Sequence, residues 1–183
     1  KEFKIDTHKA IKRKISVNPV LHSFQMVVNK YSIDLDLIDK FLQSMEQDLN
    51  DIHYSNSDYK EYIVGSAEVV GLMCLKVFVN GDDNLYSNLE EPARRLGAAF
   101  QKINFLRDVK ADYQVLGRTY FPGVDLEKFT HAEKLKIELD IQDDFENALK
   151  GIVKLPSSSR LGVYVAYRYY FTLFKKIKKI SSD

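Results

Sequence analysis

Three oxygen-bearing side chains recur at a four-residue interval in one stretch of the sequence. Asn104, Asp108 and Asp112 are the members of this row, and at about 100° per residue they spread over ~80° of one helix face. Gln101 shares that face, and apolar residues border it on both sides. Two carboxylates and an amide suit a hard cation such as Mg²⁺, which takes oxygen ligands and is usually completed by waters and substrate phosphates.

Two arginines accompany the row. Arg107 precedes Asp108, and Arg118 follows Asp112 by six residues. Guanidinium groups bind phosphate oxygens bidentately, so the segment has the chemistry of a diphosphate-binding site. The same spacing is also compatible with a solvated helix face on which Arg107 pairs with a neighbouring carboxylate. The spacing alone leaves both interpretations open.

Helical periodicity dominates the rest of the chain, and strand-like alternation is scarce. Asn18-Pro19 and Asp34 are helix-start signals, Pro92 is expected to open the long helix that carries the row, and Asp82-Asp83 is expected to be a turn. The sequence predicts an all-α fold in a single α-helical domain over residues 1–183. The expected helices span about 2–16, 19–31, 35–53, 58–79, 92–115, 131–151 and 157–180.

Composition excludes several classes of function. The net charge of +1 gives no field for nucleic acid, and no apolar run approaches the ~20 residues of a membrane span. Cys74 is the one cysteine, so an intrachain disulfide is excluded and a cytoplasmic, reducing compartment is expected; Cys74 itself is expected in the core. No His-x-x-x-His pair, phosphate-binding Gly-rich loop or Glu-x-x-His pair of a di-iron bundle is present.

Three segments together resemble one family. NFLRDVKAD at 104–112 followed by GRTYFP at 117–122 resembles the second aspartate-rich motif of squalene and phytoene synthases. YIVGSAEVVGLM at 62–73 is similar to another helix of that family, and SMEQDL at 44–49 to a third segment, with Ser44 where Gly is usual. The resemblance covers about residues 15–175 and is closest to bacterial phytoene synthases. It implies the helical bundle of the isoprenoid synthases.

The resemblance implies an activity and a set of roles. The activity is Mg²⁺-dependent head-to-head condensation of two prenyl diphosphates, geranylgeranyl diphosphate giving phytoene through a cyclopropyl diphosphate, with no nucleotide cofactor. The alternatives are squalene or dehydrosqualene synthesis from farnesyl diphosphate, or a non-catalytic bundle that binds diphosphate or a partner. The implied metal ligands are Asn104, Asp108 and Asp112; the catalytic residues Asp108, Asp112 and Tyr120; and the substrate-binding residues Gln101, Arg107, Arg118, Tyr62, Tyr164 and Arg168.

The chemistry needs a dry cavity whose walls are apolar or aromatic, because water would trap a carbocation. Helical spacing offers one set of side chains for such a wall. The candidates are Tyr59, Tyr62, Val69, Val70 and Met73. Small residues at Gly65, Ala67 and Gly71 allow close approach of either a prenyl chain or a neighbouring helix, and the sequence does not separate the two.

The sequence departs from the family at one motif. No segment matches the family's first aspartate-rich motif, Asp-x-x-x-Asp, and the run Asp34, Asp36, Asp39 is placed at a helix start, where carboxylates serve the dipole. We expect that Lys1 is not the natural start, that the leading helices are missing, that this polypeptide alone is inactive, and that a second copy covers the apolar surface so exposed.

A basic run closes the last expected helix. Lys175, Lys176, Lys178 and Lys179 follow an aromatic stretch. Lysines there complement the helix dipole, and the alternative is peripheral contact with an anionic membrane.

Overall fold

The computed structural model describes the backbone of residues 2–49, 56–116, 121 and 130–179, with the side chains of these residues except 56 and 109–116. The elements in chain order are α1 (Glu2–Arg13), α2 (Pro19–Tyr31), α3 (Leu35–Gln47), α4 (Asn56–Ile63), the π-helical segment η1 (Val64–Glu68), α5 (Val69–Phe78), α6 (Asp83–Leu116), α7 (His131–Ile152) and α8 (Ser157–Ile177). Every element of this described part is helical, which confirms the all-α prediction. None of the helices described is long and apolar enough to cross a bilayer.

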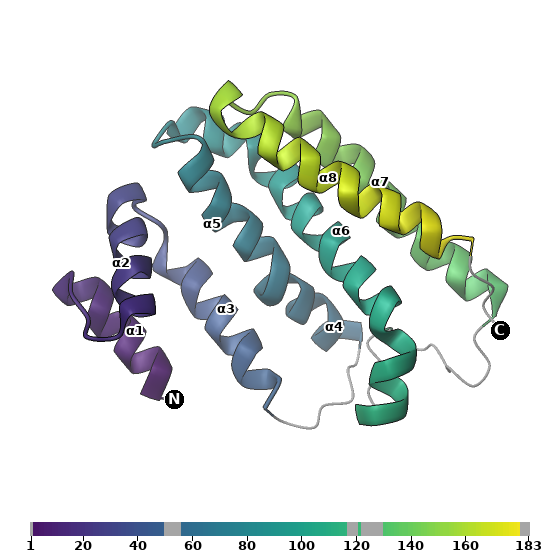
Figure 1. The fold of residues 1–183 in the computed structure, drawn as a ribbon, viewed down its shortest axis with the longest axis horizontal. Coiled ribbons are helices and arrows are strands. Elements are labelled where there is room, and N and C mark those ends of the chain that lie inside the picture. The colour runs from purple at the N-terminus through teal and green to yellow at the C-terminus, as the bar shows by residue number, and fades with distance from the viewer. Residues whose placement is uncertain (1, 50–55, 117–120, 122–129, 180–183) are drawn as a thin grey trace.

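The helices form a curved row with α6 in the middle (Figure 1). α5 lies on one side of α6 and the antiparallel pair α7–α8 on the other, while α3 follows α5 and the short helices α1 and α2 lie at the end of the row. The largest apolar cluster joins α6 to α7 and α8 around Ile103, Ile141 and Phe145, none of which has exposed surface. The helix α6, which carries the polar row, is therefore held in place by neighbouring helices on both sides.

Side chains cap two helix starts, Asn18 as the sequence predicts and Thr130 in addition. Asn18 accepts hydrogen bonds from the backbone amides of Val20 and Leu21, and Thr130 forms a reciprocal capping box with Glu133 at the start of α7. Asp34 occupies the N-cap position of α3, but its side chain makes no capping hydrogen bond. Local chemistry therefore decides the α2 and α7 starts.

The predicted start of the long helix at Pro92 is wrong. α6 begins at Asp83 and contains Pro92 in its interior, because the Asp82 carboxylate accepts a hydrogen bond from the amide of Leu85 and caps the helix there. The proline ring is accommodated by α7, where a Cβ at Gly151 would lie 2.2 Å from Pro92 Cβ. Tertiary packing thus offsets the local cost of a proline inside a helix.

Candidate functional site

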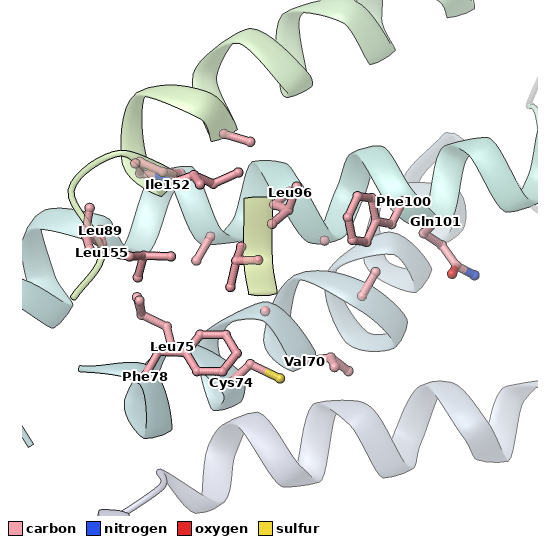
Figure 2. Close-up of a pocket in the computed structure, with 18 of the residues that line it drawn as sticks. Val70, Cys74, Leu75, Phe78, Leu89, Leu96, Phe100, Gln101, Ile152 and Leu155 are labelled. Carbon is pink, nitrogen blue, oxygen red and sulfur yellow. The ribbon is translucent and has the colours of Figure 1, made fainter. Parts of the chain in front are cut away.

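A cavity of about 330 Å³ lies beside the contact between α5 and α6. The end of α7 and the start of α8 close it, and Gln101 lies at one end while Phe78, Leu89 and Leu155 lie at the other (Figure 2). Among the described residues, its lining is apolar except for Ser66, Cys74 and Gln101. Its remaining walls are made by Ala67, Val70, Gly71, Leu75, Pro92, Ala93, Leu96, Gly97, Phe100, Ala148, Gly151, Ile152 and Val163.

Small residues bring the two main walls together. A Cβ on Gly97 would lie 2.5 Å from the carbonyl oxygen of Ala67, and one on Gly71 would lie 2.6 Å from that of Ala93. These two contacts show that η1 and α5, which follow each other in the chain, run antiparallel to α6 at backbone distance. Ala67 and Gly71 also line the cavity, so the small residues serve helix packing and the cavity wall together.

The predicted aromatic wall lies mostly elsewhere. Of the five wall candidates, only Val70 lines the cavity. Val69 is fully buried in a neighbouring core, where Met73 also packs. Tyr59 and Tyr62 instead pack against Phe105 at ring-centroid distances of 6.1 and 5.9 Å.

The polar row continues along α6 from the Gln101 end of the cavity. Asn104 lies nearly one turn beyond Gln101, and its Oδ1 is buried without a hydrogen-bond partner among the described residues. Asp108 lies one turn further, with 41% of its side chain exposed. Asp112 is on the same helix, but its side chain is outside the described part. The row therefore passes from the cavity through a buried amide oxygen to a carboxylate that solvent reaches.

Among the described residues, the Asp108 carboxylate accepts two hydrogen bonds, both from its neighbour Arg107. Nε of Arg107 donates to Oδ1 at 2.8 Å, and a terminal guanidinium nitrogen donates to Oδ2 at 2.6 Å. These bonds lower the pKa of the Asp108 carboxyl and raise the pKa of the Arg107 guanidinium. The carboxylate is thus ionised and in contact with a phosphate-binding type of cation.

The sequence left open whether this helix face is a cation site or a solvated surface. The unpartnered Oδ1 of Asn104 fits a cation ligand, because a buried polar oxygen without a hydrogen bond is unfavourable. Asp108 supplies an ionised carboxylate in the next turn, and oxygen donors are those that Mg²⁺ prefers. Within the described residues no three His, Cys, Asp or Glu side chains group together.

The remaining predicted substrate residues are dispersed. The Tyr62 hydroxyl donates to Asp48 Oδ2 at 3.1 Å, which joins the 62–73 segment to SMEQDL. Tyr164 stacks on Tyr167 with 6.1 Å between ring centroids, and Arg168 is exposed. Arg118 and Tyr120 lie outside the described residues.

Two residues near the row were assigned no role from the sequence. Phe100 lines the cavity and stacks on Tyr170 of α8 with 4.0 Å between ring centroids. Lys102 donates to Asp140 and, at 2.6 Å, to Asp144 of α7, which also accepts from Arg95 at 3.0 Å. The sequence signal that could have found Phe100 and Lys102 is their position directly before and after Gln101.

Two other sequence expectations have clear outcomes. The first concerns the upstream Asp run, where Asp39 pairs with Lys4 and His8 and Asp36 pairs with Lys40, so these two carboxylates have structural partners. The second concerns Cys74, which was expected in the core and is instead exposed on the cavity lining. Apolar surroundings still raise the pKa of its thiol.

The described helices have the bundle arrangement of the isoprenoid-synthase class of fold. The squalene synthase HpnC from Alicyclobacillus acidocaldarius has this fold, with a TM-score of 0.81 and 15% identity over 97% of this chain and 72% of that structure. At this identity the comparison shows the fold alone, and it confirms the predicted architecture.

The chain belongs to the squalene/phytoene synthase family, whose model matches residues 1–183. It is 25% identical over 169 residues to the bifunctional lycopene cyclase/phytoene synthase of Blakeslea trispora, covering 82% of this chain and 28% of that protein. It is 35% identical over 96 residues to the 15-cis-phytoene synthase of Synechocystis sp., covering 44% of this chain and 28% of that protein. The chain spans 28% to 54% of the length of the curated phytoene synthases that it matches.

Proposed function

We propose that this chain contributes to an enzyme that condenses two prenyl diphosphates head to head, with geranylgeranyl diphosphate as the substrate and phytoene as the product. One observation carries the proposal: the apolar cavity ends at Gln101, and the oxygen row of Asn104 and Asp108 continues from there along the same helix. A molecule with a hydrocarbon chain and a diphosphate head matches this arrangement, with the chain in the apolar cavity and the head beside the oxygen row. The curated relatives are named phytoene synthases, which supports this product over squalene.

Asn104, Asp108 and Asp112 would hold Mg²⁺. When bound, Mg²⁺ would neutralise the charge of the leaving diphosphate. Arg107 would shift from Asp108 to phosphate oxygens, since its side chain is 51% exposed and a guanidinium group binds phosphate bidentately. Arg118 would be a second phosphate ligand and Tyr120 a neighbour of the reacting carbons, as the family resemblance implies.

The cavity would protect the reacting hydrocarbon from water. Its described walls offer few groups that could attack a carbocation, since Ser66, Cys74 and Gln101 are their polar members. The Phe100 ring lies beside Gln101 and is backed by Tyr170 at 4.0 Å. An aromatic face at this end would stabilise positive charge on the allylic carbons next to the diphosphate.

Turnover tests the proposal. The chain, joined to an N-terminal segment that carries an Asp-x-x-x-Asp helix, is incubated with Mg²⁺ and labelled C15 or C20 diphosphate, and hydrocarbon products are extracted. We expect a C40 hydrocarbon from the C20 substrate and none from an Asp108→Ala variant. A C30 product from C15 substrate alone would support the squalene-type alternative. Absence of any hydrocarbon from a folded protein would overturn the proposal.

We also propose a peripheral contact with an anionic membrane through α8. Leu161, Val165 and Tyr169 recur at four-residue intervals on this helix and are 72%, 59% and 69% exposed. Basic side chains at Arg168 and Lys176 are exposed on the same helix. An apolar stripe with flanking cations is the pattern of an interfacial helix.

A further inference from the structure

We propose that Phe78, Leu89 and Leu155 form the closed end of the cavity and limit the prenyl chain that it accepts to C20. The inference rests on the proposed function, because it assigns the cavity to the hydrocarbon part of a prenyl substrate. It adds the residues that select the substrate by length.

The three side chains lie together at the end opposite Gln101 (Figure 2). They come from three places in the chain: Phe78 ends α5, Leu89 is in the second turn of α6, and Leu155 lies between α7 and α8. Leu89 and Leu155 are 2% and 5% exposed and belong to one buried cluster, against which Phe78 packs while only partly buried. Phe78 is thus the member of the closed end that can be shortened with least loss of core packing.

The length of the cavity follows from α6. Gln101 and Leu89 are twelve residues apart on this helix, which corresponds to about 18 Å at a rise of about 1.5 Å per residue. A fully extended chain gains about 1.2 Å per bond, so an isoprene unit of four main-chain bonds adds about 5 Å. Four units, about 19 Å, match the distance between the two ends, and a fifth unit would meet Phe78, Leu89 and Leu155.

The only cysteine of the chain provides a readout that does not depend on turnover. Cys74 lines the cavity and is exposed, so a chain bound in the cavity should slow its alkylation by N-ethylmaleimide. The probes are geraniol, farnesol, geranylgeraniol and the C25 prenyl alcohol, whose binding does not require the diphosphate site. In the native sequence we expect the alcohol concentration that halves the alkylation rate of Cys74 to fall from C10 to C20. For the C25 alcohol this concentration should be at least about tenfold higher than for the C20 alcohol.

Shortening the closed end should move this limit by one isoprene unit. In Phe78→Ala we expect the C25 alcohol to protect Cys74 at least as well as the C20 alcohol, because the lost ring leaves room for the fifth unit. Phe41→Ala is the matched control, since Phe41 packs against the same cluster from α3 without lining the cavity. It should keep the native preference for C20.

Two further variants, of which Phe78→Leu is the milder, cover the case in which Phe78→Ala does not fold, as judged by thermal unfolding. Phe78→Leu and Leu155→Ala each shorten one member of the closed end. As in Phe78→Ala, each should lower the half-protection concentration of the C25 alcohol relative to that of the C20 alcohol. The inference is overturned if the native sequence accepts C25 as readily as C20, or if folded variants keep the native ratio. If no alcohol of any length protects Cys74 in the native sequence, the assignment of the cavity to a prenyl chain fails, and the proposed function loses its main support.

Discussion

Gly97 of α6 lies directly against Ala67 of η1, with only 2.5 Å between the carbonyl oxygen of Ala67 and the position of a Cβ on Gly97. The contact fixes the position of α6 along its axis relative to η1 and α5, and both residues form part of the cavity wall. A backbone atom cannot rotate away as a side chain would, so this distance allows no substitution without a helix shift.

Gly97→Ala should therefore destabilise the protein. We expect a loss of about 1–3 kcal/mol in the free energy of unfolding, measured by denaturant titration. Gly162→Ala is the matched control, because nothing lies within 4 Å of a Cβ at Gly162 in α8. It should be neutral or stabilising by up to about 1 kcal/mol. Equal effects of the two substitutions would contradict the close contact.

Asn104→Leu should separate stability from function. The substitution removes a buried oxygen that has no hydrogen-bond partner, so we expect an unchanged or higher melting temperature. The proposed cation ligand is lost at the same time. Turnover by the chain joined to an N-terminal segment with an Asp-x-x-x-Asp helix should therefore fall about 100-fold or more. Asn104→Asp, which keeps an oxygen donor, should retain more activity. A destabilised but fully active Asn104→Leu protein would assign Asn104 a structural role.

Lys102→Met should destabilise the contact between α6 and α7. Asp144 is 1% exposed and would keep only Arg95, so we expect a loss of about 1–3 kcal/mol. Lys40→Met removes an exposed pair with Asp36 and should cost under about 1 kcal/mol. Similar losses in both variants would argue against a special contribution from the buried pair.

The same lysine gives a pH dependence. Burial lowers the pKa of Lys102, but hydrogen bonds to Asp140 and Asp144 raise it more, and the net effect is a pKa above the ordinary 10.5. A cation whose pKa is raised on folding contributes its full stability below the unfolded pKa and loses it as pH rises through the folded pKa. The stability difference between the native protein and Lys102→Met should therefore be constant near pH 8 and shrink above about pH 10.5. Unfolding titrations at both pH values measure it.

Vesicle flotation tests the α8 surface. The native protein should float with vesicles that contain acidic lipid and remain in solution with neutral ones. Val165→Asp should reduce flotation, because it places a charge in the apolar stripe. Val153→Asp, at a residue 57% exposed outside α8, should leave flotation unchanged. Flotation that ignores both lipid charge and Val165→Asp would rule out this contact, and sedimentation without lipid would show whether a second copy covers the stripe instead.

Sequence reasoning was most reliable where a single local signal acted. Asn18 caps α2 through its own side chain, so the α2 start could be read directly. The α7 start was also expected near residue 131, and the structure shows that Thr130 caps it. At α6 two signals competed, Asp82 as a cap and Pro92 as a first-turn residue. The Pro92 ring inside the helix is accommodated by Gly151, a residue of another helix that no local pattern connects to Pro92.

By itself, the sequence determined the all-helical fold, the family and the row of Asn104, Asp108 and Asp112, because helical periodicity and motif spacing are properties of neighbouring residues. Only the tertiary structure decided which side chains surround the cavity. Phe78, Leu89 and Leu155 line the end opposite Gln101, and Cys74 lines the cavity wall instead of the core. Such groupings arise from helices packed at backbone distance, and the positions of those contacts depend on residues far apart in the chain.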